Sequence, residues 1–437
     1  MNLITDTVRS FPTFEKREEA FVQSVSALLP RRHVGPRLFW QDFSKIIGAM
    51  DTRDLVEPVA YITANPRDCL AFSTSRQVLR AAGMQAAVSH PAYEERAEEV
   101  ARKFNFENHL AQPIRTLSGG ETVKLALAKA HIGADTAVKL AMASPFCWLD
   151  KDNLGYLEGV LADYRKRNIP VTLFTLEGED DADPIMGDTD LGAAWSTPVC
   201  FSLATQRLRL TLGSSLVAFN MPPPPEVQVG DFEARLFSPC LWVGGNGQGK
   251  SLMARVFSGA VRFRGSTQLT GPNGRRYVRL LFQDVIAQTL LRSFKTIRSQ
   301  AGIRGSDTIS GIYRRLISII NRMAPHLPLG ESGPRNGALP TILETKAILV
   351  AVRLAHDPGA LILDEPDWGL SRTAATAFVA AVVNVSHRLD LPVILITHKP
   401  WWDIVVKSRV RIVKSDVAMA EGRVASFQIR LEEVPNA

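Results

Sequence analysis

The chain has 437 residues, 46% of them hydrophobic and 22% charged, so it is long enough and apolar enough to fold as two or three globular domains. Its formal net charge of +7 permits contact with nucleic acid or an anionic membrane surface, but the basic residues are scattered and select neither partner. No apolar run approaches the roughly 18 to 20 residues of a membrane span, the N-terminus lacks a leader pattern and the four cysteines are widely spaced, so we expect a cytoplasmic protein with reduced thiols and no zinc site.

The first half of the chain alternates helical and strand-like segments, and its opening fifty or so residues contain no glycine-rich loop. In order, we expect a helix at 14–29, a strand at 56–63, a helix-rich stretch at 76–110, a helix that opens at 115–121 and runs to 130, a strand at 145–150, a helix at 154–166 and a strand at 171–175. This alternation is typical of a parallel α/β sheet with an added helical subdomain.

A loop-like acidic stretch at 178–198 and four prolines at 222–225 indicate a boundary between two halves. We place it so that the domains are 1–205 and 206–437. The second half repeats the pattern of the first, with strands expected at 240–243, 278–282, 360–363 and 392–397, helices at 252–257, 343–356 and 372–388, and a helical stretch up to about 325. An internal repeat of roughly 200 residues therefore organises the chain.

A complete phosphate-binding loop stands between an expected strand and an expected helix of the second half. Gly244 is followed by four residues and then by Gly249, Lys250 and Ser251. Glycines let the backbone N–H groups curl around phosphates, Lys250 can reach the terminal phosphates, and the Ser251 hydroxyl can ligate magnesium. A chance match is the alternative, but the strand, loop and helix are the context that this motif needs, so the stretch predicts a bound nucleoside triphosphate.

Polar residues with matching chemistry follow three later strands. The apolar strand at 360–363 leads into Asp364, which would hold magnesium, and Glu365, which would polarise the attacking water. His398 ends the next strand within reach of a terminal phosphate, and Gln283 ends another strand where it could ligate magnesium or sense the water. Taken singly, the carboxylates could be solvated loop residues, His398 could be an ordinary surface histidine, and Gln283 is a weak signal.

Taken together, these motifs resemble those of ATP-binding cassette (ABC) ATPases. The stretch 244–251, Gln283, the Asp-Glu-Pro at 364–366 and His398 resemble the family's Walker A, Q-loop, Walker B and H-loop in order and spacing. In the first half, Leu-Ser-Gly-Gly-Glu at 117–121 matches the family's signature motif. The resemblance covers about residues 55–430 and implies two tandem nucleotide-binding domains of the α/β class, each a P-loop core plus a helical subdomain, the first lacking its P-loop.

Each half departs from the family pattern in a different place. In the first half no P-loop is found, Ala64 stands where the Q-loop glutamine is expected, and the Walker B and H-loop counterparts are taken as 147–151, with Lys151 replacing the glutamate, and as 174–177, without histidine. A cation in place of the base cannot activate water. In the second half the signature position falls at 340–344, where Ile342 and Leu343 replace both glycines and would block a close backbone approach to phosphate.

Because family members pair their cassettes head to tail, the resemblance implies that the surviving halves are complementary and form one composite site within this chain, with the other site inactive. Its expected cofactors are ATP and Mg²⁺. The ATP-binding residues would be Gly244, Asn246, Gly247, Gly249, Lys250 and Ser251, with Ser118, Gly119 and Gly120 closing on the γ-phosphate; the metal ligands would be Ser251, Gln283 and Asp364; the catalytic residues would be Glu365, His398 and Gln283. Phe219 is a candidate for stacking on adenine, and Ser371 replaces a common aspartate of the D-loop.

The segment at 59–66 and the helix expected after it look like the membrane-docking region of energy-coupling-factor and cobalt-type importer ATPases. This resemblance implies a motor docked on a transmembrane transport subunit at the inner face of the membrane. One alternative is a soluble ABC ATPase acting on nucleic acid or the ribosome. Two features that such proteins have are not found in this sequence, a long basic linker between the cassettes and a coiled-coil insertion, and this argues against the alternative. Another is an ATP-binding regulatory protein with little turnover, against which Glu365 and His398 argue.

Overall fold

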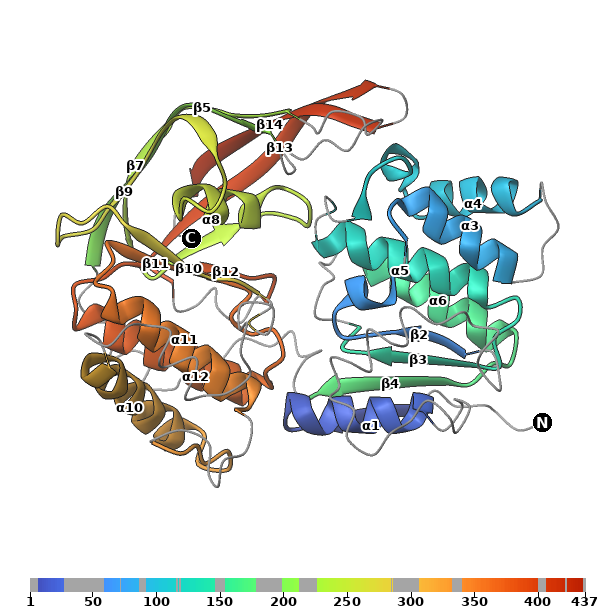
Figure 1. The fold of residues 1–437 in the computed structure, drawn as a ribbon, viewed down its shortest axis with the longest axis horizontal. Coiled ribbons are helices and arrows are strands. Elements are labelled where there is room, and N and C mark those ends of the chain that lie inside the picture. Colours follow the sequence, from blue (N-terminus) through green and yellow to red (C-terminus); the bar gives the residue numbers. More distant parts are fainter. Residues whose placement is uncertain are drawn as a thin grey trace.

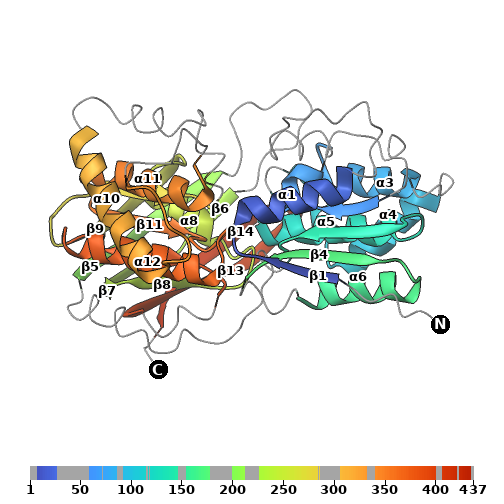
Figure 2. The same cartoon turned by 90° about the horizontal axis from the view of Figure 1, so that it is seen from below.

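The computed structural model describes residues 7–26, 59–70, 72–85, 92–114, 117, 119–145, 154–177, 199–211, 226–283, 285, 306–331, 340–399, 406–420 and 423–434. These residues form two α/β units that lie side by side, the N-terminal unit in blue to green and the C-terminal unit in light green through yellow to red (Figure 1). The view from below shows the same two bodies next to one another (Figure 2). The α/β fold class is confirmed.

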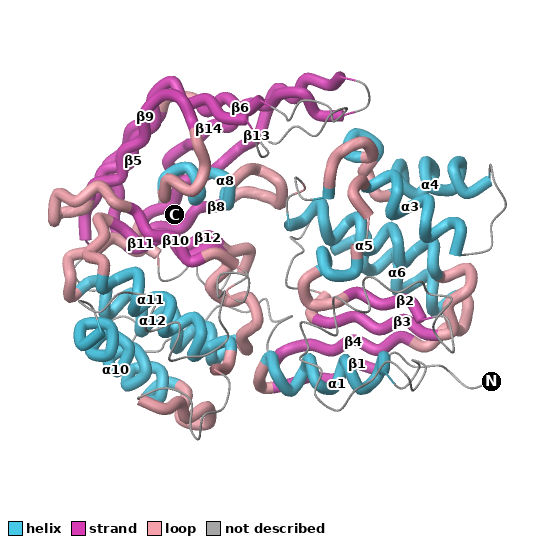
Figure 3. Tube along the Cα trace, in the orientation of Figure 1, coloured by secondary structure: helices cyan, strands magenta, loops and turns pink. Residues whose placement is uncertain are grey.

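The first unit is built on a four-stranded parallel sheet with the strand order β1-β4-β3-β2. The strands are β1 Thr7–Phe11, β2 Val59–Ile62, β3 Lys139–Ala143 and β4 Val171–Leu176, and the α-helices are α1 Phe14–Ser26, α3 Ser75–Gln85, α4 Ala92–Lys103, α5 Gly119–Gly133 and α6 Leu154–Lys166. Every residue of β4 is buried, which requires cover on both faces of the sheet. In Figure 3, α1 covers one face, while α5 and α6 lie on the other.

The second unit is built on a larger mixed sheet with the order β10-β11-β12-β8-β13-β14-β6-β5-β7, and β9 pairs with β5. Its strands are β5 Val199–Thr211, β6 Glu226–Val229, β7 Phe232–Ser238, β8 Cys240–Val243, β9 Phe263–Thr270, β10 Val278–Leu281, β11 Ala360–Asp364, β12 Val393–Ile396, β13 Ser408–Ala420 and β14 Arg423–Val434. Its α-helices are α8 Lys250–Phe257, α10 Ser306–Met323, α11 Ile342–Ala355 and α12 Arg372–His387.

The parallel core of the second sheet repeats the whole first sheet. The order β10-β11-β12-β8 corresponds to β2-β3-β4-β1, and the registers agree: Ala143 pairs with Phe174 as Asp364 pairs with Ile396. In this correspondence β1 and α1 take the places of β8 and α8. The repeat expected from the sequence therefore reaches back to the first described residues, where no motif indicated it.

The expected strand at 145–150 is wrong. The strand is β3, which ends at Ala143, and Pro145 lies in the turn after it, while 146–150 lie outside the described residues. A central parallel strand must donate backbone N–H groups to its neighbours, and proline has none to give. The small residues of 139–143 can be buried between β2 and β4, although the run that follows them is more apolar.

The other elements agree with expectation to within a few residues, and α6 agrees at both ends. The expected domain boundary at 205 falls inside β5, all of which lies in the larger sheet, so the two sheets divide between Glu177 and Val199. The two-domain assignment itself stays a prediction. None of the described helices is long and apolar enough to cross a lipid bilayer.

Candidate functional site

The glycine loop lies between β8 and α8, as expected. Gly249 caps the helix with φ +98°, a left-handed conformation that glycine adopts without strain. A Cβ built on Gly244 would stand 2.5 Å from the carbonyl oxygen of Ile412, and one on Gly249 would stand 2.5 Å from Cδ1 of Ile429. Strands β13 and β14 thus press against the loop and leave no room for side chains at these two glycines.

Lys250 begins α8, and its ammonium group is held inside the loop. Its Nζ donates to the carbonyls of Gly244 and Gly245 at 2.6 and 3.0 Å and lies 3.3 Å from Nε2 of His398. The side chain is buried, so this positive charge is concentrated where backbone N–H groups of the loop also gather. Such a place suits the phosphates of a nucleotide.

Ser251 and Asp364 meet at the end of β11. The Ser251 hydroxyl donates to Oδ1 of Asp364 at 3.0 Å. Burial raises the pKa of Asp364 to about 6, although the hydrogen bond from Ser251 opposes the rise. Gln283 follows β10, which pairs with β11, so it comes off the same edge of the sheet. A buried carboxylate beside a hydroxyl offers the hard oxygen ligands that Mg²⁺ prefers, and these residues fit that ion.

Glu365 occupies a strained turn directly after β11. Its φ is +49°, and its N–H donates to the carbonyl of Ile396 at 2.8 Å. Burial, followed by the nearby Asp367 and Asp364, raises the pKa of its carboxyl group well above the ordinary value. Its Oε1 lies 3.3 Å from Nε2 of His398. A buried carboxylate with a raised pKa is a suitable proton acceptor, since general bases work best with a pKa near the working pH.

Two positioning residues escaped the sequence analysis. Oδ1 of Asp367 accepts a 2.9 Å hydrogen bond from Thr397, whose hydroxyl accepts the N–H of Lys399 at 3.1 Å, and this network fixes the turn that carries His398. Lys346 is fully buried on α11, and its Nζ donates to the carbonyl of Pro366 at 2.6 Å. The available signals were a third carboxylate just after the paired ones and a lone lysine within a largely apolar helix.

The signature stretch of the first unit touches the glycine loop of the second. Helix α5 begins at Gly119, and a Cβ built on Gly120 would stand only 2.4 Å from Cβ of Asn246. Upstream, Nη2 of Arg67 donates to the carbonyl of Leu117 at 2.8 Å and ties the turn before α5 to the first unit. Ser118 and Phe219 lie outside the described residues. The start of α5, where backbone N–H groups have no helical partners, therefore abuts the loop expected to hold phosphates.

In the first unit the equivalent positions carry no such chemistry. By strand register, Ala64, Ala143, Ser144 and Leu176 stand where the second unit has Gln283, Asp364, Glu365 and His398. Ser144 even keeps the left-handed φ of Glu365, at +47°, and its N–H donates to Phe174. The counterpart of the paired carboxylates is therefore 143–144, not 147–151, and it is an alanine and a serine rather than an aspartate and a lysine.

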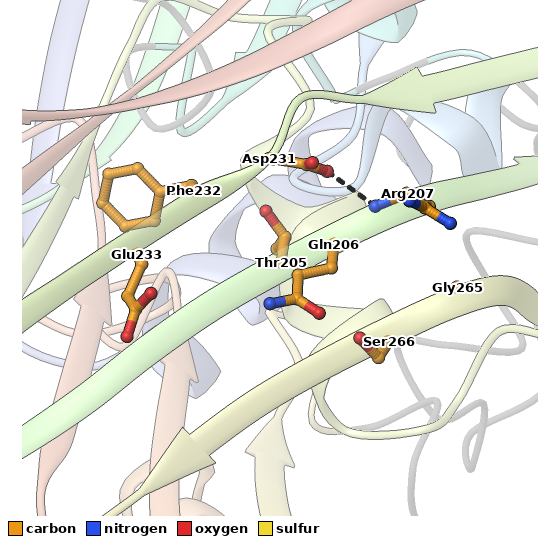
Figure 4. Close-up of a pocket in the computed structure, with 8 residues that line it drawn as sticks. All are labelled: Thr205, Gln206, Arg207, Asp231, Phe232, Glu233, Gly265 and Ser266. Carbon is orange, nitrogen blue, oxygen red and sulfur yellow. Dashed lines mark hydrogen bonds between the residues drawn. The ribbon is translucent and has the colours of Figure 1, made fainter.

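A separate cavity of about 640 Å³ lies away from all of these residues, among β5, β7 and β9. Figure 4 shows Thr205, Gln206, Asp231 and Glu233 around it, with the N–H of Arg207 donating to Asp231. Of the site residues expected from the sequence, none that the structure describes lines it.

The sequence has relatives among ABC transporter and import ATP-binding proteins. No protein-family model matches it. It is 26% identical over 180 residues to the spermidine/putrescine import ATP-binding protein PotA of Thermotoga maritima, a match covering 39% of this chain and 47% of that protein. It is 25% identical over 174 residues to the ABC transporter G family member STR of Medicago truncatula, covering 36% of this chain and 21% of that protein. The matches thus span less than half the length of either relative.

Among solved structures, a model of ribosome-bound archaeal Pelota and ABCE1 contains a chain with a similar fold. The TM-score is 0.55 at 15% identity, and the match covers 98% of this chain and 74% of that one. At this identity the similarity concerns the fold alone, and it extends over both units.

Proposed function

We infer that this chain, a tandem ATP-binding cassette ATPase by sequence and fold, hydrolyses ATP with Mg²⁺ at one composite site between its two units. The observation that carries the proposal is the contact of Gly120 with Asn246, because it joins a signature helix from one unit to a phosphate loop from the other. The sequence relatives, one named as an ABC transporter and the other as an import ATP-binding protein, support the same activity.

Each described residue of the site has a role that its geometry supports, and the role of Ser118 rests on the resemblance of 117–121 to the signature motif alone. The loop at 244–249 and Lys250 bind the phosphates, and the start of α5, with Ser118, Gly119 and Gly120, closes on the γ-phosphate. Ser251, Gln283 and Asp364 would hold Mg²⁺, which supplies positive charge to the phosphate oxygens. Glu365 accepts the proton of the attacking water, and His398, 3.3 Å from it, orients that water and the γ-phosphate.

The opposite site has lost each of these groups, so we propose one productive ATP per chain. It has Ala143 and Ser144 in place of the two carboxylates, and Ile342 and Leu343 in place of the signature glycines. Closure on ATP at the composite site and reopening after hydrolysis would be the motion that performs work.

A pair of glycine variants tests the composite site. Gly120 and Gly159 both lie on helices of the first unit, but a Cβ at Gly120 would overlap Asn246 whereas one at Gly159 meets nothing within 4 Å. We expect Gly120→Ala to lower magnesium-dependent ATP turnover by on the order of 10²-fold through misplacement of the two halves, and Gly159→Ala to leave it unchanged. Equal turnover of the two variants would remove the composite site from consideration.

We further propose that the work is transport, with this chain as the motor docked on a transmembrane subunit. The supporting observation is Phe72, whose side chain is 47% exposed just after the short helix Pro66–Cys69 of the expected docking segment. An exposed aromatic residue there suits an apolar partner surface. The second candidate is work on a ribosome, and it is favoured by the fold similarity to a chain from a ribosome-bound complex.

Stimulation of ATP turnover separates the two candidates. Detergent-solubilised membranes and purified ribosomes from the host are added in parallel to the wild type, to Phe72→Ser and to Leu389→Ser, a control at a similarly exposed apolar residue of the second unit. The transport proposal expects stimulation by membranes only, lost in Phe72→Ser and kept in Leu389→Ser. Stimulation by ribosomes alone would replace it with the second candidate.

A further inference from the structure

The turn between β1 and α1 is a shortened version of the glycine loop. In the second unit six residues, 244–249, separate β8 from α8, whereas in the first unit only Pro12 and Thr13 separate β1 from α1. Strand and helix remain in equivalent places, but the segment that could surround phosphates is missing. The first residues of α1 consequently reach the second unit directly.

Glu15 contacts the start of α11, the helix at the signature position of the second unit. Its Oε1 accepts a 2.8 Å hydrogen bond from the N–H of Ile342, the first residue of α11. The helix is otherwise capped by Thr341 and Glu344, which hydrogen-bond each other's backbone N–H groups. A carboxylate at a helix N-terminus is favourable because of the partial positive charge there. Glu15 thus accepts a hydrogen bond from the first N–H group of α11. In the composite site the corresponding N–H groups, at the start of α5, would face phosphate.

Phe14 and Thr13 extend this contact over the loop that follows β11. The rings of Phe14 and Trp368 lie 5.5 Å apart, and both side chains are buried. Thr13 forms an antiparallel β-bridge with Leu370. A Cβ on Gly369 would stand 3.1 Å from the Phe14 ring, so the loop and the ring are in close contact. Backbone pairing, aromatic packing and a hydrogen-bonded carboxylate therefore join the units on this side.

A fourth contact lies next to these. The N–H of Arg372, at the start of α12, donates to the carbonyl of Glu177 at 3.0 Å, just beyond β4. Within the first unit, the guanidinium of Arg17 lies over the Phe14 ring at 4.4 Å and supports its position. Figure 1 shows the start of α1 beside the second unit, on the opposite side of the interface from the start of α5.

We propose that residues 13–15, with Ile342, Trp368 and Leu370, form a hinge that stays closed with or without nucleotide, so that ATP opens and closes only the composite side. A second nucleotide would have to displace Glu15 from α11 and separate Phe14 from Trp368, and its phosphates would meet no glycine loop there. The role of the hinge in an ATP-driven cycle rests on the proposed function. Whether the contact stays closed with and without nucleotide can be measured independently of that function.

A disulfide across the hinge tests that permanence. The double variant Thr13→Cys/Leu370→Cys is made in a background with Cys147→Ser and Cys200→Ser, which leaves the buried Cys69 and Cys240. Partners in an antiparallel bridge have Cα atoms about 4.5 to 5.5 Å apart, which lies within the range for disulfides. Each single-cysteine variant is the matched control for oxidation elsewhere in the chain.

We expect the disulfide to form to the same extent with and without Mg-ATP, and the oxidised protein to hydrolyse ATP within threefold of its reduced form. A larger loss that a reductant reverses, a yield that falls when Mg-ATP is added, or no disulfide at all would each overturn the hinge. If the wild type itself hydrolyses no ATP, the proposed function fails, and the disulfide yield with and without nucleotide still decides the hinge.

Discussion

Helices α5 and α11 begin at equivalent places in the two units, yet they meet different surfaces. At the start of α5, Gly120 abuts the side chain of Asn246 on a six-residue glycine loop. At the start of α11, Ile342 donates its N–H to a carboxylate of the other unit's helix. The comparison shows that the two units keep the same sheet order and strand register although the turns after β1 and β8 differ in length, so these turns determine which groups face each helix.

The largest difference between the two sides should concern catalysis. Glu365→Gln keeps the shape of the side chain and removes the proton acceptor, so we expect ATP turnover to fall by on the order of 10² to 10⁴-fold while ATP binding remains. Phosphate release and equilibrium nucleotide binding are the measurements. Ser144→Ala, at the equivalent position of the first unit, should change neither, and an effect of that variant would contradict the assignment of a single active side.

The hinge side should depend most on an aromatic contact. Phe14→Ala deletes a buried ring that packs on Trp368, so we expect the free energy of unfolding to fall by about 3 to 5 kcal/mol in denaturant titrations. Phe14→Leu, which retains most of the apolar volume, should lose clearly less. Equal losses in both variants would mean that the ring itself contributes little to joining the units.

On the composite side, a buried charge should lower the free energy of unfolding. Since the pKa of Asp364 rises in the folded protein from 3.8 to about 6, ionisation destabilises the folded state as pH rises through this window. We therefore expect Asp364→Asn to raise the free energy of unfolding of nucleotide-free and metal-free protein by up to about 3 kcal/mol above pH 7, with little change near pH 4. Unfolding titrations from pH 4 to 8 in a chelator measure it, and a pH-independent difference would argue against a charge effect.

A pH dependence of the same sign is expected on the hinge side. Burial raises the pKa of Glu15, and the hydrogen bond from Ile342 opposes the rise, so ionisation weakens the folded state as pH rises above the ordinary carboxyl range. Glu15→Gln keeps the hydrogen-bond acceptor without the charge, so it should stabilise the protein at pH 8 relative to the wild type but not at low pH. The exposed Glu19→Gln on the same helix is the control and should show no such trend.

The parallel core of the second unit was predictable from sequence because motifs stand at the ends of its strands, whereas β5, β6, β9, β13 and β14 carry no motif and were not expected. A glycine loop after an apolar strand fixed the places of β8 and α8, and the carboxylates at 364–365 fixed the end of β11. The first unit was harder to predict. Its helix α1 was expected, but without a glycine loop nothing in 7–13 indicated a strand, and only the pairing of β1 with β4 shows that the two elements take the places of β8 and α8.

The remaining errors have a common physical cause. The position of β3 is decided by its backbone pairing with β2 and β4. Local hydrophobicity, which favoured a strand at 145–150, does not decide it. Lys346 and Glu15 act on groups distant in sequence: one donates to the carbonyl of Pro366, and the other accepts from Ile342. No local sequence pattern predicts such partners, because the interacting groups come together only when the chain has folded.

The hydrogen bond between Glu15 and Ile342 also bears on how the protein is made. The two residues are 327 positions apart. At about 5 to 20 residues per second, the ribosome extends the chain for roughly 16 to 65 s between them. During that interval Phe14 lies at the edge of a nascent first unit without the aromatic surface that later covers it. The first unit must keep its sheet folded until the second unit has been synthesised. Until then the Phe14 ring is not buried by Trp368, and a chaperone or another incompletely folded chain can bind to it.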